Sequence, residues 1–139
     1  MNIDTSTEFG ARVFRRLESE EVIWLTTVRP NGVPEPSPVW FLWNGSDVIV
    51  YSQPNTQKLK DIAHDPKVAL NLNCTPDGGD VIILTGDAQV VAGAPPATGL
   101  SAYLEKYRKA IAQIGMTPDT FAQSYSVQIR ITPNKVRGH

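Results

Sequence analysis

The sequence predicts a small, mainly β protein, an antiparallel barrel of six or so short strands with a few helices at its corners. Short segments rich in β-branched and aromatic residues are separated by tight-turn signals such as Pro30-Asn31-Gly32 and Asn44-Gly45. Longer segments with apolar residues at helical spacing interrupt them in only a few places. The chain has 139 residues, which suffices for one core but not for two, so we expect a single domain over residues 1–139.

The amino-terminal half is expected to hold a helix, two hairpins and a second short helix. Apolar residues recur at helical spacing over residues 9–17, and Ser6 or Thr7 can cap that helix. Prolines at positions 34, 36 and 38 keep to one side of an extended chain, as at the edge of a sheet. After this first helix we expect strands over residues 22–28, 34–43 and 47–52. A second helix follows, which Asn55 or Thr56 caps and which ends at His64.

The carboxy-terminal half continues the sheet and adds a helical segment. Gly86 interrupts a long β pattern and predicts a bulge or a bend. Glu105 to Lys109 is interpreted as a solvated helix face, and residues 137–139 as a frayed end. We expect strands over residues 68–73, 81–91 and 125–131, a helix over residues 101–114 that stops at Gly115, and a helical turn over residues 118–123.

The composition excludes several classes of protein. Thirteen basic and fourteen acidic residues leave the chain near neutral, which argues against a general nucleic-acid binder. No apolar run approaches the roughly 18 residues of a membrane span, and the polar amino terminus is unlike a signal peptide. We therefore expect a cytoplasmic protein. The single cysteine, Cys74, follows a predicted strand and is interpreted as a buried structural thiol, and no metal-ligand spacing is present.

Residues 52–60 carry the clearest functional signal, at a strand-to-helix turn. Ser52 and Thr56 offer hydroxyls, Lys58 and Lys60 offer ammonium groups, and the first turn of the helix offers free backbone N–H groups. Together these groups form a candidate anion site, since charge-assisted hydrogen bonds to phosphate are strong. From the residues alone, an anion site and an ordinary polar loop with two solvated lysines are equally good interpretations.

The order of several segments resembles the pyridoxamine 5′-phosphate oxidase-like proteins of the FMN-binding split β-barrel fold. The resemblance runs from about Val22 to Arg137 and is strongest to the short actinobacterial branch of coenzyme F-420-dependent oxidoreductases. It rests on Trp24-Leu25-Thr26-Thr27-Val28, Gly32, Pro38-Val39-Trp40-Phe41, Tyr51-Ser52, Lys58 and Asp65-Pro66-Lys67-Val68-Ala69-Leu70.

The resemblance implies a homodimer with a flavin or deazaflavin between the subunits. Coenzyme F-420 is the expected cofactor, with FMN as the alternative, and the expected activity is hydride transfer to a small organic acceptor. The residues implied in cofactor binding are Pro38, Val39 and Trp40 along the ring system and Ser52, Thr56, Gln57 and Lys58 at the phosphate, with Lys60 as a further candidate. A non-catalytic flavin-binding dimeric module remains a second alternative.

Two departures from the family pattern qualify this expectation. Many relatives have arginine where this chain has Gln57, which carries no charge. Lys60 can compensate in part, although helix geometry turns it about 200° away from Lys58. The chain also lacks the arginine and histidine arrangement that binds substrate phosphate in true pyridoxamine 5′-phosphate oxidases, so we do not expect that substrate.

The other candidate residues have structural explanations. Trp40 and Trp43 lie three positions apart on a strand and so face opposite sides. Tyr103 and Tyr107 share a helix face and are expected to pack. Arg130 can reach an anionic cofactor tail or lie at the surface. No residue is assigned as catalytic, because a bound cofactor can supply the hydride chemistry.

Overall fold

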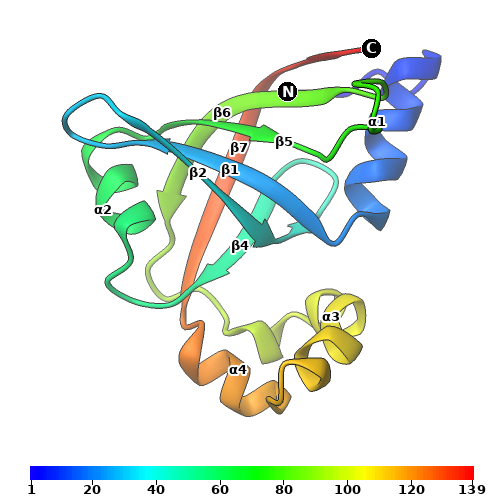
Figure 1. Cartoon of the computed structure of the whole chain (residues 1–139). Helices are drawn as coiled ribbons and strands as arrows, with labels where there is room; N and C mark the ends of the chain where they lie inside the picture. Colours follow the sequence, from blue (N-terminus) through cyan, green and yellow to red (C-terminus); the bar gives the residue numbers. More distant parts are fainter.

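The computed structural model describes all 139 residues and contains seven strands, four α-helices and one 3-10 turn. Figure 1 shows how these elements are arranged. In chain order the elements are α1 (Glu8–Ser19), β1 (Val22–Val28), β2 (Pro34–Trp40), β3 (Leu42–Trp43), β4 (Val48–Ser52), α2 (Gln57–His64), β5 (Lys67–Asn71), β6 (Ile82–Val90), η1 (Ala97–Gly99), α3 (Ser101–Gln113), α4 (Pro118–Ser124) and β7 (Val127–Gly138).

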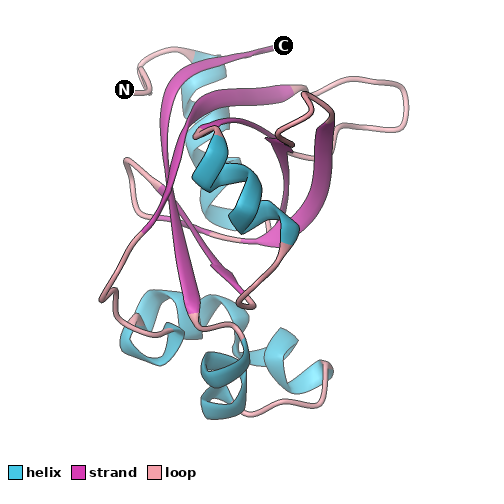
Figure 2. Cartoon of the chain, turned by 90° about the vertical axis from the view of Figure 1, so that its left-hand side faces the viewer, coloured by secondary structure: helices cyan, strands magenta, loops and turns pink.

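The strands form one antiparallel sheet in the order β2-β1-β5-β6-β7-β4-β3. The sheet curls into a half-barrel, and helix α2 packs against β1 and β6 across its opening (Figure 2). Helices α3 and α4 lie together at one end of the barrel in both views. The predicted mainly β, antiparallel barrel fold is confirmed, and the proline-rich strand β2 lies at the sheet edge, as expected.

The core lies inside the curl of the sheet, where strands contribute every second residue. In β1 the inward side chains Ile23 and Leu25 are fully buried, and the residues between them are half-buried. Strand β4 is buried on both faces. Val50 faces the barrel core, whereas Ile49 and Tyr51 pack against α3 and α4. The α3–α4 pair is therefore held on the outer face of β4 by apolar contacts.

Two backbone irregularities shape the sheet. The register between β6 and β7 shifts between Thr85 and Gly86, which confirms the predicted bulge. A side chain at Gly86 would bring its Cβ within 2.4 Å of the Thr132 carbonyl oxygen. The strand predicted over residues 34–43 breaks at Phe41, because its N–H donates to the Tyr107 hydroxyl (2.8 Å) and its carbonyl accepts from Lys106 Nζ (2.8 Å).

Three sequence-based expectations were wrong. Cys74 is exposed, because β5 ends at Asn71 and the thiol falls in the following loop. The carboxy-terminal residues are paired rather than frayed, since the backbones of His139 and Val81 exchange two hydrogen bonds (2.9 and 3.0 Å). The stretch around Lys106 is not a fully solvated helix face, because that side chain reaches in to Phe41.

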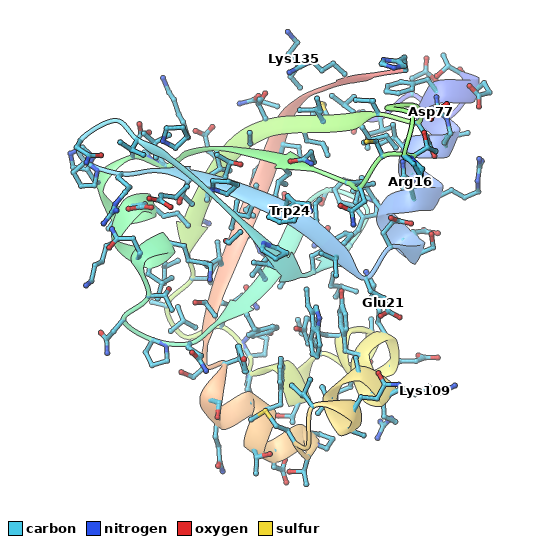
Figure 3. The ribbon with its side chains drawn as sticks, viewed as in Figure 1. Arg16, Glu21, Trp24, Asp77, Lys109 and Lys135 are labelled. Atoms are coloured by element: carbon cyan, nitrogen blue, oxygen red, sulfur yellow. The ribbon has the colours of Figure 1, made fainter.

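Figure 3 shows the side chains on the ribbon, with Trp24 on β1 and Arg16 on α1 among those labelled. Trp24 lies on the outer face of β1, where its indole N–H donates to the Asn73 side-chain oxygen (2.9 Å). Arg16 extends from α1, donating to the carbonyl oxygens of Asn73 and Asp80 and so fixing the β5–β6 loop. None of the helices is both long and apolar enough to cross a membrane.

Candidate functional site

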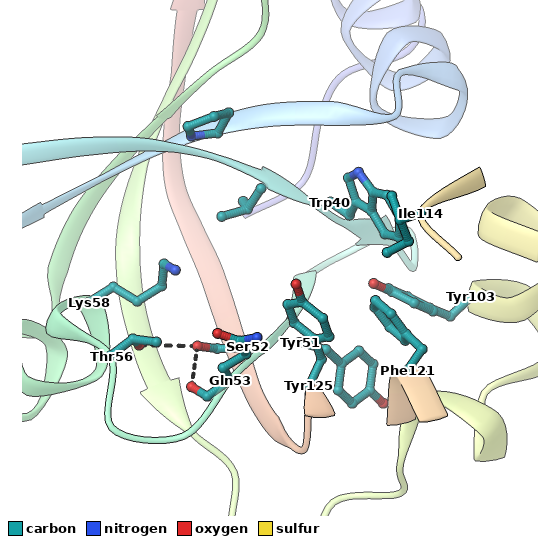
Figure 4. A pocket seen from close by; sticks show the side chains of 12 residues that line it. Trp40, Tyr51, Ser52, Gln53, Thr56, Lys58, Tyr103, Ile114, Phe121 and Tyr125 are labelled. Atoms are coloured by element: carbon teal, nitrogen blue, oxygen red, sulfur yellow. Dashed lines mark hydrogen bonds between the residues drawn. The ribbon is translucent and has the colours of Figure 1, made fainter. Parts of the chain in front are cut away.

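A pocket of about 320 Å³ opens between strands β2 and β4, the amino-terminal end of α2, and the α3–α4 pair (Figure 4). It contains six of the eight residues predicted to bind a cofactor: Pro38, Val39, Trp40, Ser52, Thr56 and Lys58. The other lining residues are Tyr51, Gln53, Tyr103, Ile114, Phe121 and Tyr125. The fold thus brings the edge strand and the strand-to-helix turn to one cavity.

The polar end of the pocket is built where β4 leads into α2. Ser52 is buried at the last position of β4, and its hydroxyl donates to the Gln53 carbonyl oxygen (2.8 Å) and lies 3.2 Å from the Thr56 hydroxyl. Asn55 adopts φ 63°, which turns the chain sharply into the helix. Thr56 occupies the predicted cap position, but its side chain makes no capping hydrogen bond. The first-turn amides of α2 are therefore left to another acceptor.

Lys58 is the only charged side chain in the pocket lining. It is half-buried and takes part in none of the ion pairs of the chain, which involve other residues. Burial lowers the pKa of its ammonium group. A bound anion would favour the charged form and offset that burial. The end of the pocket that holds Ser52, Thr56 and Lys58 is therefore suited to an anionic group.

Gln57 and Lys60 do not line the pocket. The Gln57 amide donates to Asp61 Oδ1 (2.8 Å), and Asp61, which is fully buried, also accepts from the Thr27 hydroxyl (2.7 Å). Gln57 thus supports Asp61, which joins α2 to β1, instead of facing a ligand. Lys60 is exposed on the other side of α2, as the helical geometry predicts.

The opposite end of the pocket is aromatic. Trp40 stacks on Tyr107 (ring centroids 4.9 Å apart, planes at 7°) and on Phe121 (5.6 Å, 21°), so its ring is held in place. Trp43, on β3, lies on the other face of the sheet and is buried in the barrel core. Its ring centroid lies 6.0 Å from that of Phe14. The predicted opposite orientation of Trp40 and Trp43 is confirmed.

Four lining residues from the α3–α4 segment were missed as site residues: Tyr103, Ile114, Phe121 and Tyr125. Tyr103 was expected to pack, which it does, but it lines the cavity as well. The only sequence signal for these residues was that they are apolar or aromatic and lie at helical spacing. That pattern does not show which surface of the protein the helices pack against. Arg130 does not line the pocket, and its guanidinium lies 3.8 Å from an Asp47 carboxylate oxygen.

The curled antiparallel sheet, the helical pair at its end and the pocket between them define a split β-barrel protein. The chain belongs to the pyridoxamine 5′-phosphate oxidase family, whose model matches residues 10–139. Proteins of this family bind flavins such as FMN, and many are dimers with the flavin at the subunit interface.

Solved structures show the same fold. An F420 reductase shares 25% sequence identity with a TM-score of 0.65, over 88% of this chain and 94% of that one. A conserved hypothetical protein from Mycobacterium tuberculosis shares 20% identity with a TM-score of 0.70, over 94% and 82%. The heme storage protein HutZ from Vibrio cholerae shares 13% identity with a TM-score of 0.65, over 99% and 95%. No curated protein matches the chain.

Proposed function

We propose that the pocket binds a flavin-type cofactor and that the protein is an oxidoreductase that transfers hydride between coenzyme F-420 and a small organic acceptor. One observation carries the proposal. An unpaired ammonium group, two hydroxyls and the start of a helix meet an aromatic wall in a single cavity. Membership of a flavin-binding family and the likeness to an F420 reductase support it.

The two ends of the pocket suit the two ends of such a cofactor. Lys58 and the hydroxyls of Ser52 and Thr56 would hold the phosphate, together with the first-turn amides of α2. The strand Pro38-Val39-Trp40 would lie along the ring system. A bound flavin or deazaflavin supplies the hydride chemistry, and these side chains bind it, orient it and exclude water.

We propose further that a second copy of the chain completes the pocket. The cavity of about 320 Å³ is at the lower end of the roughly 300–1,000 Å³ of ligand sites, so one chain covers only part of a cofactor with a long tail. Pro38 pairs directly with Trp24, so both lie on the outer face of the sheet. Helices α3 and α4 cover this face at Trp40, whereas Pro38 is exposed, which leaves the part around Pro38 available to a partner subunit.

Cofactor titration of the purified protein tests the proposal. F-420 is expected to bind at micromolar concentration or below and more tightly than FMN, and light scattering is expected to give the mass of a dimer. Tighter binding of FMN would favour an FMN-dependent oxidoreductase of the same family. Binding without turnover of any quinone, enone or tetrapyrrole would favour a non-catalytic flavin-binding module. If neither cofactor binds, the proposed function is wrong.

The likeness to HutZ shows a shared fold and nothing about function. The pocket lining contains no histidine, cysteine or methionine, and of the side chains that ligate haem iron it offers only tyrosines. The two histidines of the chain, His64 and His139, lie at the end of α2 and at the carboxy terminus. The pocket is better suited to a phosphate-bearing planar ligand.

A further inference from the structure

The polar end of the pocket supplies one full positive charge. Lys58 is the only charged residue in the lining, and it forms no ion pair within the chain. Ser52 and Thr56 add hydroxyls, which donate hydrogen bonds but carry no charge. Figure 4 shows these three side chains on the same side of the cavity, across from its aromatic end.

No other cationic side chain lines this pocket. Lys60 is exposed on the other side of α2, and Arg130 lies outside the lining, 3.8 Å from an Asp47 carboxylate oxygen. The first turn of α2 adds a partial charge of at most about half a unit, and the helix has only eight residues. One chain therefore offers a bound phosphate little more than a single positive charge.

Phosphate esters differ in the charge that they bring to such a site. A phosphomonoester carries about two negative charges above its second pKa of about 6, whereas a diester has no second acidic proton and carries one. Going from one charge to two doubles the attraction to Lys58. The free energy of removing the ion from water rises with the square of its charge, so it increases about fourfold. A half-buried site with a single ammonium group therefore favours the diester.

The surface at this end of the pocket also has room for a second ester substituent. Gln53, Pro54 and Asn55 follow Ser52 in the chain, and all three are exposed. Gln53 lines the pocket as well. A substituent on the phosphate can therefore leave the pocket past Gln53 and remain in water, whereas a monoester would bring a second charge that no side chain of this chain balances.

We propose that Lys58 selects a phosphodiester over a phosphomonoester, with the second substituent of the phosphate directed past Gln53 into solvent. This inference rests on the proposed function and deepens it, because it names the class of phosphate ester that the cofactor carries. It agrees with coenzyme F-420, whose phosphate is a diester, and not with FMN, whose phosphate is a monoester.

Three flavins with one ring system test the proposal: riboflavin, FMN and the methyl ester of FMN, which is a diester. Flavin fluorescence quenching at about pH 7.5, where FMN is largely a dianion, gives their dissociation constants. The methyl ester is expected to bind wild-type protein about 5-fold more tightly than FMN, the equivalent of about 1 kcal/mol. Riboflavin is expected to bind most weakly, because it has no charge for Lys58.

A variant with a second cation supplies the decisive readout. Gln53→Lys adds an ammonium group at the phosphate end of the pocket, and Gln53→Met is its neutral control of similar length. Gln53 is exposed, so neither substitution is expected to change the unfolding midpoint. Gln53→Lys is expected to raise the affinity for FMN about 5-fold more than that for the methyl ester, whereas Gln53→Met leaves their ratio as in wild type. Because the methyl group is present in every comparison, this change in the ratio reports the charge.

Two results with the flavins would overturn the proposal. Binding of FMN at least as tightly as its methyl ester would mean that a second cation, from a partner copy, neutralises the dianion. An unchanged ratio in Gln53→Lys would also contradict it. If no flavin binds, the proposed function fails, and 1-naphthyl phosphate and its methyl ester then test the charge preference without a flavin. Tighter binding of the naphthyl diester supports the proposal, and equal or absent binding of this pair overturns it.

Discussion

Replacing Lys58 by methionine removes the one charged group of the pocket and keeps a side chain of similar length. A hydrogen bond to a charged group contributes about 1.5–3 kcal/mol, which corresponds to roughly 10- to 150-fold in Kd. Coulomb's law gives a consistent range, because opposite unit charges 4 Å apart attract by about 1 kcal/mol in water and about 4 kcal/mol at an effective dielectric constant of 20. Half burial places Lys58 between these limits.

The assay compares FMN with riboflavin, which lacks the phosphate, on wild-type protein and on the Lys58→Met variant. Flavin fluorescence quenching gives the four dissociation constants, and their ratio isolates the coupling between Lys58 and the phosphate. We expect the variant to lose FMN affinity by the factor above and to bind riboflavin as wild type does. Lys60→Met is the matched control, because Lys60 lies on the exposed side of the same helix.

Two results would refute this assignment. An equal loss for FMN and riboflavin would show that Lys58 supports the fold of the pocket rather than the phosphate. A Lys60→Met variant as impaired as Lys58→Met would show that only long-range charge matters. The pH dependence gives a further check. Burial lowers the pKa of Lys58, so FMN affinity should decline with rising pH earlier than an ordinary lysine would allow, whereas riboflavin affinity should not.

Three further substitutions test contacts outside the pocket lining. Gln57→Ala removes a donor to buried Asp61, so urea unfolding should show a loss of about 1–3 kcal/mol with FMN affinity unchanged, and a selective loss of FMN affinity would contradict us. Gly86→Ala places a Cβ against the Thr132 backbone and should cost about 1–3 kcal/mol, whereas an unchanged midpoint would mean that the bulge relaxes. Burial lowers the pKa of Lys106 to about 8 from 10.5, so between these values the unfolded chain binds a proton that the folded chain does not. Stability relative to the Lys106→Met variant should therefore rise with pH above 8, and a constant difference in unfolding free energy across pH 8 would refute this.

The strands that sequence patterns predicted well are those whose ends are marked locally. Strand β1 begins and ends where expected, because Pro30-Asn31-Gly32 follows it and its apolar residues keep one period. The break at Phe41 was missed because its cause, the Tyr107 hydroxyl, lies 66 residues further along the chain. Strand β7 runs on to Gly138 for the same kind of reason, since its partner there is Ile82.

The same contrast separates the two ends of the pocket. Ser52, Thr56 and Lys58 are close in the sequence, at the turn between β4 and α2, so their types and spacing were enough to place them together. The aromatic end is assembled from separate helices, and helical periodicity cannot distinguish a residue that packs from one that also lines a cavity. The position of Gln57 had a local signal that was overlooked, because Asp61 follows it at the i,i+4 spacing of helix partners.

The choice between an oxidoreductase and a non-catalytic carrier depends on the aromatic end. A phosphate site serves both functions equally, so Lys58 does not discriminate between them. A carrier gains most from enclosing the ring system, whereas an enzyme must leave a path by which an acceptor reaches it. Ile114 lines the cavity and is nonetheless 50% exposed, so the α3–α4 pair does not seal the pocket in a single chain. This opening is the kind of path that an acceptor would need to reach the proposed cofactor, so it favours the oxidoreductase.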